Sequence, residues 1–212
     1  MKAPHFWSAG LDPRSREAAP LTRLLLSPLA FAYRLGVQAK LKKAVPVGVG
    51  IPVICVGNLT VGGVGKTPVV AAIRSALTAR GMRAATLSRG YGGGAKGVVR
   101  VQSGTHTAAD VGDEPLMLAA SGESWIGRDR VAAARAMEAD GVQVIVMDDG
   151  HQNPSLHKDL SIIVIDTAAP FGNGHLLPKG PLREPVADGL ARAQGVVLMG
   201  EGDMPAPVQR AG

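Results

Sequence analysis

Cysteine, aromatic residues and long uncharged apolar runs are all scarce in this sequence, and each shortage excludes a class of protein. Cys55 is the single cysteine among 212 residues, so an internal disulfide is impossible and a secreted, disulfide-stapled domain is excluded. The uncharged segment 24–33 is too short to span a bilayer, contains Pro28 and lacks the cleavage-site pattern of a secretory signal. The remaining composition, 46% hydrophobic and 19% charged, is typical of an intracellular globular domain with a buried, reduced Cys55.

Positive charge is concentrated at one end of the chain. The net charge is +6, and residues 1–43 contain eight basic residues against two acidic ones, whereas residues 44–212 contain fifteen of each. A body without excess charge argues against nucleic acid as a partner, and the basic segment favours contact with an anionic surface. The pattern therefore divides the chain into a basic N-terminal arm, residues 1–43, and a body, residues 44–212.

The arm is predicted to contain an amphipathic helix between Leu21 and Leu41. Its apolar residues and flanking charges suit a helix that lies on a membrane surface, with Phe6, Trp7 and Tyr33 as candidate interface anchors. The alternative is a first helix that packs on the domain's own core. The charge asymmetry favours the membrane surface.

A glycine-rich stretch of the body has the pattern of a phosphate-binding loop, Thr60-Val61-Gly62-Gly63-Val64-Gly65-Lys66-Thr67. It follows the apolar run 52–56 and precedes a predicted helix, 68–80, which is the strand–loop–helix order that such a loop requires. Its glycines let backbone N–H groups point at an anion, Lys66 can reach the β- and γ-phosphates of a nucleotide, and the Thr67 hydroxyl can ligate Mg²⁺. Thr60 stands where the usual pattern G-x-x-x-x-G-K-[ST] has its first glycine. The stretch predicts a P-loop nucleotide-binding protein.

Strands and helices are predicted to alternate after this loop, as they do in α/β domains. One helix is expected to follow the segment 111–115 and to end at residue 120, and two more are expected over 128–139 and 186–193. A long loop rich in glycine and proline is expected over 171–184. Apolar runs predict strands at 84–87, 98–101, 142–147, 160–165 and 196–199. The expected fold is a P-loop NTPase-like α/β domain with a doubly wound, mainly parallel sheet and the N-terminal amphipathic helical arm.

Two adjacent aspartates end the most apolar of the predicted strands. Asp148 and Asp149 have the position of a Walker B carboxylate, and Mg²⁺ prefers oxygen ligands of this kind. Because successive residues of a strand point to opposite sides, only one of the two is expected to contact the metal. The alternative is a solvated turn with Gly150.

Further charged residues lie in loops beside the predicted strands. Asp113 and Glu114 precede Pro115 at a helix start, where acidic residues often serve only as caps, although a carboxylate there can also accept a proton from an attacking hydroxyl. Arg89 and Arg183 lie in glycine-rich loops, where a guanidinium can hold phosphate through two hydrogen bonds. Surface pairing with a neighbouring acid is the alternative for both arginines. The histidines show no zinc-ligand spacing with cysteine.

Together these motifs resemble the tetraacyldisaccharide 4′-kinases, the lipid A 4′-kinases of Gram-negative bacteria. The resemblance runs from the N-terminus to about residue 200, with the motifs in the family's order. The family's loop reads T-V-G-G-x-G-K-T, which accounts for Thr60. The matching segments are Pro4-His5-Phe6-Trp7, the stretch 56–68, Ser88-Arg89-Gly90-Tyr91-Gly92, Gly112-Asp113-Glu114-Pro115, Asp148-Asp149-Gly150-His151-Gln152, Gly172-Asn173-Gly174, Leu177-Pro178 and Gly180-Pro181-Leu182-Arg183-Glu184-Pro185.

The resemblance implies transfer of the γ-phosphate of ATP to the 4′-hydroxyl of a tetraacyldisaccharide-1-phosphate, a lipid A precursor, to give lipid IVA. It implies ATP and Mg²⁺ as cofactors. The loop from Thr60 to Thr67, and Lys66 above all, would hold the phosphates. Thr67 and either Asp148 or Asp149 would hold the metal.

The same resemblance implies a catalytic role for Asp113, as the base or orienting group for the sugar hydroxyl. Arg89, Glu114, Arg183 and Glu184 are candidates for contact with the substrate. The protein would lie peripherally on the cytoplasmic face of the inner membrane, where a basic arm would meet an anionic leaflet and the acylated substrate.

Two departures from the family pattern are present. The family reads D-D-G-F-Q-H where this sequence has His151-Gln152-Asn153 after Gly150. The family also continues beyond the equivalent of Met199 into a C-terminal portion, which supplies a histidine that works with the aspartate matching Asp113. Residues 44–212 are therefore expected to form a kinase domain that lacks this portion.

Two other functions stay open as alternatives. A partitioning- or maturation-type ATPase has the loop K-G-G-x-G-K-T-T, but Val61 and Pro68 stand at its leading lysine and second threonine. A non-catalytic, membrane-associated nucleotide-binding protein is the alternative from a different class, and lipid-dependent ATP consumption would distinguish it from the kinase. A GTPase is disfavoured because the sequence contains neither N-K-x-D nor T-K-x-D. The sequence carries no signal for an oligomeric state.

Overall fold

The computed structural model describes residues 3–12 and 14–210, so Lys2, which belongs to the basic residues of the arm, lies outside the described part. The chain forms two compact units. The first, called here the arm unit, comprises Met1–Lys43, Asn58–Val64 and Ile163–Gly212. The second, called the sheet unit, comprises Ala44–Gly57 and Gly65–Ile162.

A mostly parallel sheet organises the chain, as the alternation of apolar runs predicted. Among the described residues it has seven strands in the order β3-β4-β2-β5-β1-β6-β7. The sheet unit contains β1 (Val53–Gly57), β2 (Ala84–Ser88), β3 (Val99–Arg100), β4 (Ser124–Ile126), β5 (Val144–Asp148) and the start of β6 (Leu160–Asp166). β5 pairs in parallel with both β1 and β2, β2 pairs in parallel with β4, and β3 pairs antiparallel with β4. The predicted fold class is confirmed.

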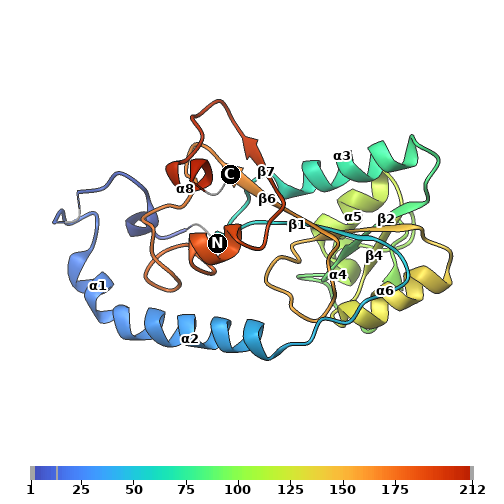
Figure 1. Ribbon diagram of the computed structural model, residues 1–212, viewed down its shortest axis with the longest axis horizontal. Helices are drawn as coiled ribbons and strands as arrows, with labels where there is room; N and C mark the ends of the chain where they lie inside the picture. Colours follow the sequence, from blue (N-terminus) through green and yellow to red (C-terminus); the bar gives the residue numbers. More distant parts are fainter. Residues whose placement is uncertain (1–2, 13, 211–212) are drawn as a thin grey trace. The chain divides into compact units, whose positions relative to one another are not determined.

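Helices cover both sides of the strands in the sheet unit. They are α3 (Lys66–Thr78), α4 (Ala108–Val111), α5 (Asp113–Ala120) and α6 (Arg130–Ala139). Figure 1 shows α3 and α6 on opposite sides of β2 and β4. The strands are buried on both faces, which explains their near-continuous apolar sequences. The main core contains Val53, Cys55, Leu87, Met137, Ile145 and Met147, and Cys55 is buried and free, as predicted.

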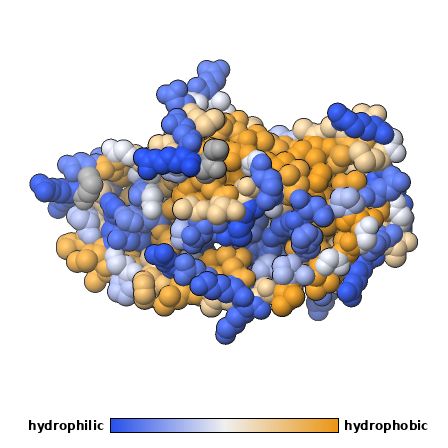
Figure 2. All heavy atoms as spheres, viewed as in Figure 1, coloured by the Kyte–Doolittle hydropathy of each residue, from blue (hydrophilic) through white to orange (hydrophobic). Residues whose placement is uncertain are grey.

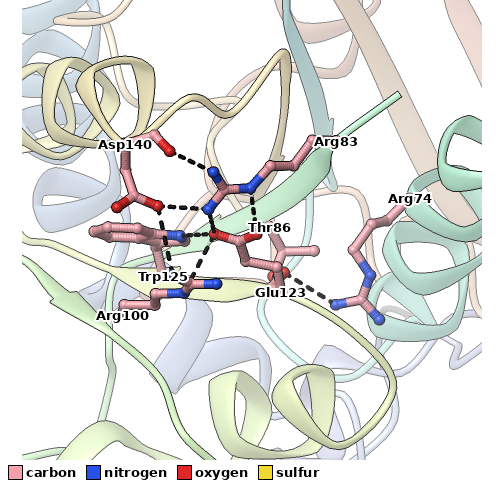
Figure 3. A network of polar contacts seen from close by, with 7 residues as sticks. All are labelled: Arg74, Arg83, Thr86, Arg100, Glu123, Trp125 and Asp140. Carbon is pink, nitrogen blue, oxygen red and sulfur yellow. Dashed lines mark hydrogen bonds and ion pairs between the residues drawn. The ribbon is translucent and has the colours of Figure 1, made fainter. Parts of the chain in front are cut away.

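One edge of the sheet unit is tied by a network of charged side chains, drawn in Figure 3. Arg83 donates to both carboxylate oxygens of Glu123, at 3.0 and 2.9 Å, and pairs with Asp140. The indole N–H of Trp125 donates to the same Glu123 carboxylate at 2.9 Å, and Arg100 lies 3.4 Å from it. The network joins the start of β2, β3, β4 and the end of α6, so polar contacts add to the apolar packing of the short strands β3 and β4.

The arm unit contains the 3-10 turn η1 (His5–Trp7), α1 (Pro20–Leu25), α2 (Ser27–Lys43), α7 (Val186–Leu190), β7 (Gly195–Met199) and α8 (Ala206–Gln209). The end of β6 pairs here with β7, whose last residue, Met199, accepts a hydrogen bond from the N–H of Thr167 at 2.9 Å. A small core holds the unit together through Leu59, Ile163, Ile165, Leu182, Leu190 and Val208.

The arm differs in one respect from its prediction: α1 and α2 replace the single helix expected between Leu21 and Leu41. The break falls at Leu26, because Pro28 has no N–H to donate to the preceding turn and is tolerated only at the start of a new helix. One face of α2 is buried or half-buried, with Ala30, Tyr33 and Val37 along it.

Other apolar side chains of the arm are exposed, namely Leu21, Leu24, Leu25, Leu29, Phe31 and Leu35. Figure 2 shows apolar residues at the surface over α1 and α2. None of the helices in residues 3–12 and 14–210 has both the length and the apolar character needed to cross a bilayer. The described part of the arm therefore presents both apolar and basic groups to its surroundings.

Candidate phosphate-binding site

The phosphate-binding loop ends in a backbone conformation suited to an anion. Gly65 has φ 79°, a left-handed conformation that favours glycine, and it directly precedes α3. Gly65 supplies no side-chain cap, and the N-terminal end of this 13-residue helix, which favours a negative charge, directly follows the loop. Lys66 is the first residue of α3 and is 8% exposed, and Thr67 is half-buried in the same turn. The predicted strand–loop–helix order is confirmed.

The conformation of Thr60 explains why threonine can replace the usual first glycine. Thr60 forms an antiparallel bridge with Leu182, and its carbonyl accepts from Asn58 Nδ2 at 2.7 Å. Among the described residues only Ala19 and Asp149 combine a side chain with a positive φ, so Thr60 has an ordinary backbone. The left-handed conformations of the loop fall on Gly62 and Gly65 instead.

Asp148, the last residue of β5, is a buried acid without a protein partner. It is 2% exposed, and among the described residues neither of its carboxylate oxygens has a hydrogen-bond partner. Burial, reinforced by the charges of Glu114 and Asp149, raises the pKa of Asp148 to about 7, although Lys66 and Arg130 oppose the rise. A cation would stabilise the ionised carboxylate further, and its two oxygens, which have no hydrogen-bond partner among the described residues, are suitable ligands for Mg²⁺.

Asp149 lies beside the lysine of the phosphate-binding loop. Its Oδ1 is 3.7 Å from Lys66 Nζ. Its φ of 53° is left-handed, a conformation that aspartate tolerates better than most residues, and it ends the extended chain of β5. The two adjacent aspartates therefore differ: Asp148 is buried in the strand end, whereas Asp149 is partly exposed and ion-paired.

Arg130 is a site residue that the sequence did not reveal. It is 4% exposed and donates to the carbonyl of Ser88 at 3.1 Å and to that of Gly127. Burial first, and then the charge of Arg89, lowers the pKa of Arg130 to about 10, while Asp148 and Asp149 raise it. The sequence shows only one arginine among several in a polar loop, and no spacing distinguishes it. Arg89 itself is exposed.

The segments 88–95 and 109–115, which include the two glycine-containing motifs, lie against each other. The N–H groups of Gly94 and Ala95 donate to the carbonyls of Ala109 and Asp110, each at 2.8 Å. A side chain at Gly112 would collide with the carbonyl of Tyr91, so glycine is required there. Asp113 and Glu114 begin α5 immediately afterwards, and both are exposed.

The remaining site residues that the sequence suggested, Arg183 and Glu184, belong to the arm unit. The N–H of Arg183 donates to the carbonyl of Leu59 and its Nε to the carbonyl of Thr60, at 2.8 and 3.1 Å. Glu184 is buried and pairs with Arg192. Arg183 is thus bonded to the phosphate-binding loop, whereas the Glu184 carboxylate has a neighbouring basic partner.

The departure at Asn153 has a local structural reason. Its Oδ1 accepts from the N–H and the hydroxyl of Ser155, at 3.0 and 2.9 Å, which closes the turn after β5. An asparagine is well suited to such a turn because its side chain mimics a backbone acceptor. Asn153 therefore stabilises the loop that follows the paired aspartates.

A parallel sheet whose first strand leads through a glycine loop into a helix, with a buried aspartate at the end of the neighbouring strand, defines a P-loop nucleotide-binding protein. Comparison with known protein families identifies the family of P-loop proteins to which the chain belongs. Residues 22–211 match the family described as tetraacyldisaccharide-1-P 4′-kinase, LpxK, and the chain belongs to this family. The resemblance noted from the motifs is confirmed.

Individual relatives agree with the family match. The chain is 64% identical over 208 residues to a tetraacyldisaccharide 4′-kinase of Hyphomonas neptunium, covering 98% of this chain and 63% of the relative. It is 54% identical over 201 residues to one of Rhodospirillum centenum, covering 95% and 58%. The crystal structure of LpxK from Aquifex aeolicus in complex with ATP has a TM-score of 0.72 and 30% identity, covering 84% of this chain and 59% of that one. The chain thus spans about three fifths of the length of these proteins.

Proposed function

We propose that this chain acts in the phosphorylation of the 4′-hydroxyl of a tetraacyldisaccharide-1-phosphate by ATP, giving lipid IVA. The observation that carries the proposal is the loop from Thr60 to Thr67, which ends with Lys66 beside Asp149 in a chain that belongs to the 4′-kinase family. The ATP present in the related crystal structure supports ATP as the phosphate donor.

The loop residues bind and orient the nucleotide phosphates. The positive end of the α3 dipole lies at the end of the loop and favours an anion, and the ammonium of Lys66 neutralises charge on the β- and γ-phosphates. Because Lys66 is already held close to Asp149, its ammonium is placed at the loop before ATP binds. This pre-organisation lowers the entropy that binding must lose.

Asp148, Asp149 and the Thr67 hydroxyl are the residues that would hold Mg²⁺. The fit is supported by the two unpaired, buried oxygens of Asp148, which no described side chain satisfies. No group of three or more His, Cys, Asp or Glu side chains in the described residues is arranged to hold a metal alone, so phosphate and water would complete the coordination. When bound, Mg²⁺ neutralises charge on the phosphate oxygens during transfer.

Asp113 is proposed to accept the proton of the sugar 4′-hydroxyl. The hydroxyl oxygen forms the new bond to the γ-phosphorus, the bond from that phosphorus to the bridging oxygen of ATP breaks, and ADP leaves. Asp113 is exposed at the start of α5, so an acceptor can approach it. Arg89, Glu114, Arg183 and Glu184 are proposed to contact the substrate, the arginines through its phosphate.

The arm is proposed to hold the protein on the cytoplasmic face of the inner membrane. Exposed apolar side chains such as Leu24 and Phe31 would enter the interface, and Lys40, Lys42 and Lys43 at the end of α2 would meet anionic headgroups. The substrate carries four acyl chains and therefore resides in the same membrane. The arm brings the enzyme to it.

The test is incubation of this chain with γ-labelled ATP, Mg²⁺ and tetraacyldisaccharide-1-phosphate in detergent micelles. Asp113→Ala is the test variant, and Asp203→Ala, which removes another exposed acid, is the matched control. Label in the lipid with the wild type and Asp203→Ala, but not with Asp113→Ala, supports the proposal. ATP binding without labelled lipid would instead favour a non-catalytic nucleotide-binding protein.

A further inference from the structure

Within the arm unit, residues 172–183 form a loop that contacts two segments far apart in the sequence. Toward one side it meets the N-terminal turn η1 and the start of the arm helices. Toward the other it meets residues 59–61 of the phosphate-binding loop. Both sets of contacts are specific hydrogen bonds, and neither follows from the strand–loop–helix pattern that identified the phosphate-binding loop.

Asn173 makes the contacts to the N-terminal turn. Its Nδ2 donates to the carbonyl of Phe6 at 2.8 Å, and its N–H donates to the carbonyl of Trp7, also at 2.8 Å. The indole N–H of Trp7 donates in return to the carbonyl of Pro178 at 3.2 Å. Further along, Arg23 contacts His175 at 2.7 Å and Lys179 donates to the Ser27 hydroxyl at 3.0 Å.

Asn173 also fixes the shape of the loop itself. The same Nδ2 donates to the carbonyl of Lys179 at 3.1 Å, and Oδ1 accepts from the N–H of His175 at 3.1 Å. Gly172 and Gly180 are packed so closely that a side chain at either would collide, at Gly172 with Pro181 and the Trp7 carbonyl, and at Gly180 with Asn173. The side chain of Asn173 therefore bonds two residues of the loop, His175 and Lys179, and the N-terminal turn at once.

The far end of the loop holds the phosphate-binding loop. The N–H of Val61 donates to the carbonyl of Pro181 at 2.8 Å, and the N–H of Arg183 donates to the carbonyl of Leu59 at 2.8 Å. Leu182 forms the antiparallel bridge with Thr60. Residues 59–61 thus form one edge of a short backbone ladder whose other edge is the loop that Asn173 shapes.

We propose that Asn173 is a positioning residue for nucleotide binding: it couples the N-terminal turn His5–Trp7 to the backbone of the phosphate-binding loop through residues 178–183. The inference rests on the proposed function, since it concerns the same nucleotide phosphates. The N-terminal turn then has a role in ATP affinity, separate from any attraction of the arm to membranes. Without Asn173, the ladder partner of residues 59–61 loses its fixed geometry, and so do the N–H groups that follow Val61 in the chain.

The experiment measures binding of MgATP to the intact chain by calorimetry, which gives affinity and stoichiometry separately. Asn173→Ala removes all side-chain contacts, and Asn173→Asp keeps the acceptor for His175 while losing the donors to Phe6 and Lys179. A third variant lacks residues 1–8 and so removes the Phe6 and Trp7 carbonyls. Gln209→Ala is the matched control, because it deletes an amide-to-carbonyl bond of 2.9 Å elsewhere in the arm unit.

Asn173→Asp loses two hydrogen bonds, and Asn173→Ala and the deletion lose three each. Each change should therefore raise the Kd for MgATP about tenfold or more, with unchanged stoichiometry. Combining Asn173→Ala with the deletion should raise the Kd little further, because both break the same connection. The Gln209→Ala control should bind as the wild type does.

An unchanged Kd in these variants, or multiplied effects in the combination, would overturn the inference. Lower stoichiometry at wild-type Kd would also overturn it, because that is the mark of a partly unfolded sample and not of a displaced loop. A wild-type chain that binds no MgATP would remove the proposed function as well, so the two failures are distinguishable.

Discussion

Lys66 Nζ lies 3.7 Å from Asp149 Oδ1, so the lysine of the phosphate-binding loop is ion-paired with the aspartate that directly follows β5. Lys66 is 8% exposed, and a buried ammonium without an anion nearby would be costly. Asp149 supplies the negative charge in the nucleotide-free state. A bound phosphate can take over this role, which would release Asp149 for contact with the metal or its water shell.

Lys66→Ala should therefore impair both phosphoryl transfer and ATP binding. We expect phosphoryl transfer to fall by about 100-fold or more, because charge neutralisation at the phosphates is lost, and the Kd for ATP to rise. Transfer of label to lipid and ATP binding are the two measurements. Lys96→Ala, which removes an exposed lysine of the sheet unit to which no role is assigned, is the control, and wild-type turnover in Lys66→Ala would refute the assignment of the loop.

Asp148→Asn should raise the thermal stability of the metal-free protein. The Tm of this variant should not respond to Mg²⁺. The pKa of about 7 corresponds to a cost of at most about 4 kcal/mol for the buried charge at alkaline pH. An unpaired asparagine amide costs about 1–3 kcal/mol in return, so the net gain is about 1–3 kcal/mol, or roughly 3–9 °C in Tm.

Thermal unfolding with EDTA and with Mg²⁺ tests this at pH 8. Mg²⁺ should raise the Tm of the wild type but not that of Asp148→Asn. Asp149→Asn is the matched control and should not gain stability, because it loses an ion pair with Lys66 and removes no buried unpaired charge. A lower Tm for metal-free Asp148→Asn would contradict the cost assigned to its carboxylate.

The sheet could be predicted from the sequence because its long strands are apolar on both faces. β1, β2 and β5 follow this rule, and their predicted bounds differ by one or two residues from those observed. β4 could not be predicted, since three residues, Ser124–Ile126, give no periodicity. Its position depends on Glu123 and the neighbouring arginines, which are tertiary contacts.

The candidate site could be predicted only in part, for a related physical reason. Lys66 and Asp148 follow from local order, because a loop after one strand and an acid after another meet at the same edge of a parallel sheet. The burial of Arg130 and the contacts of Asn173 with the N-terminal turn arise from packing between distant segments. No local pattern encodes them. Whether Asp113, Arg89 or Arg183 contacts the substrate stays a prediction.

Glu123→Gln should destabilise the protein without affecting nucleotide binding. Burial raises the pKa of Glu123, but hydrogen bonds from Arg83 and Trp125 and the charge of Arg100 lower it more, so the carboxylate is charged in the fold. Losing it leaves Arg83 with a neutral partner, at a cost of about 2 kcal/mol or roughly 4–8 °C in Tm. Thermal unfolding measures the loss of stability, and ATP titration measures whether the Kd for ATP is unchanged. A changed Kd for ATP would show that the network reaches the site.

His175 should make stability depend on pH below about 6.5. Burial, Lys179 and Arg23 lower the pKa of His175, so the folded protein binds fewer protons there than the unfolded chain does. Stability is therefore unaffected above the unfolded pKa of about 6.5 and is lost as the pH falls below it. His175→Gln keeps an acceptor for Arg23 but does not titrate, so its Tm should fall less between pH 7.5 and 5.5. Parallel Tm profiles for the two proteins would contradict this origin.

The double variant Leu24→Ser, Leu25→Ser should weaken attachment to membranes without altering the fold. Both leucines are exposed in α1, so thermal stability should stay within about 0.5 kcal/mol of wild type. Burying even part of two leucine side chains in the interface is worth about 1.5 kcal/mol or more, so binding to anionic vesicles should fall about tenfold or more.

Sedimentation with phosphatidylglycerol vesicles measures this binding. Met204→Ser, an exposed apolar residue of the same unit outside the arm, is the control and should bind as the wild type does. Equal vesicle binding by the double variant and the wild type would mean that these leucines contact something other than lipid.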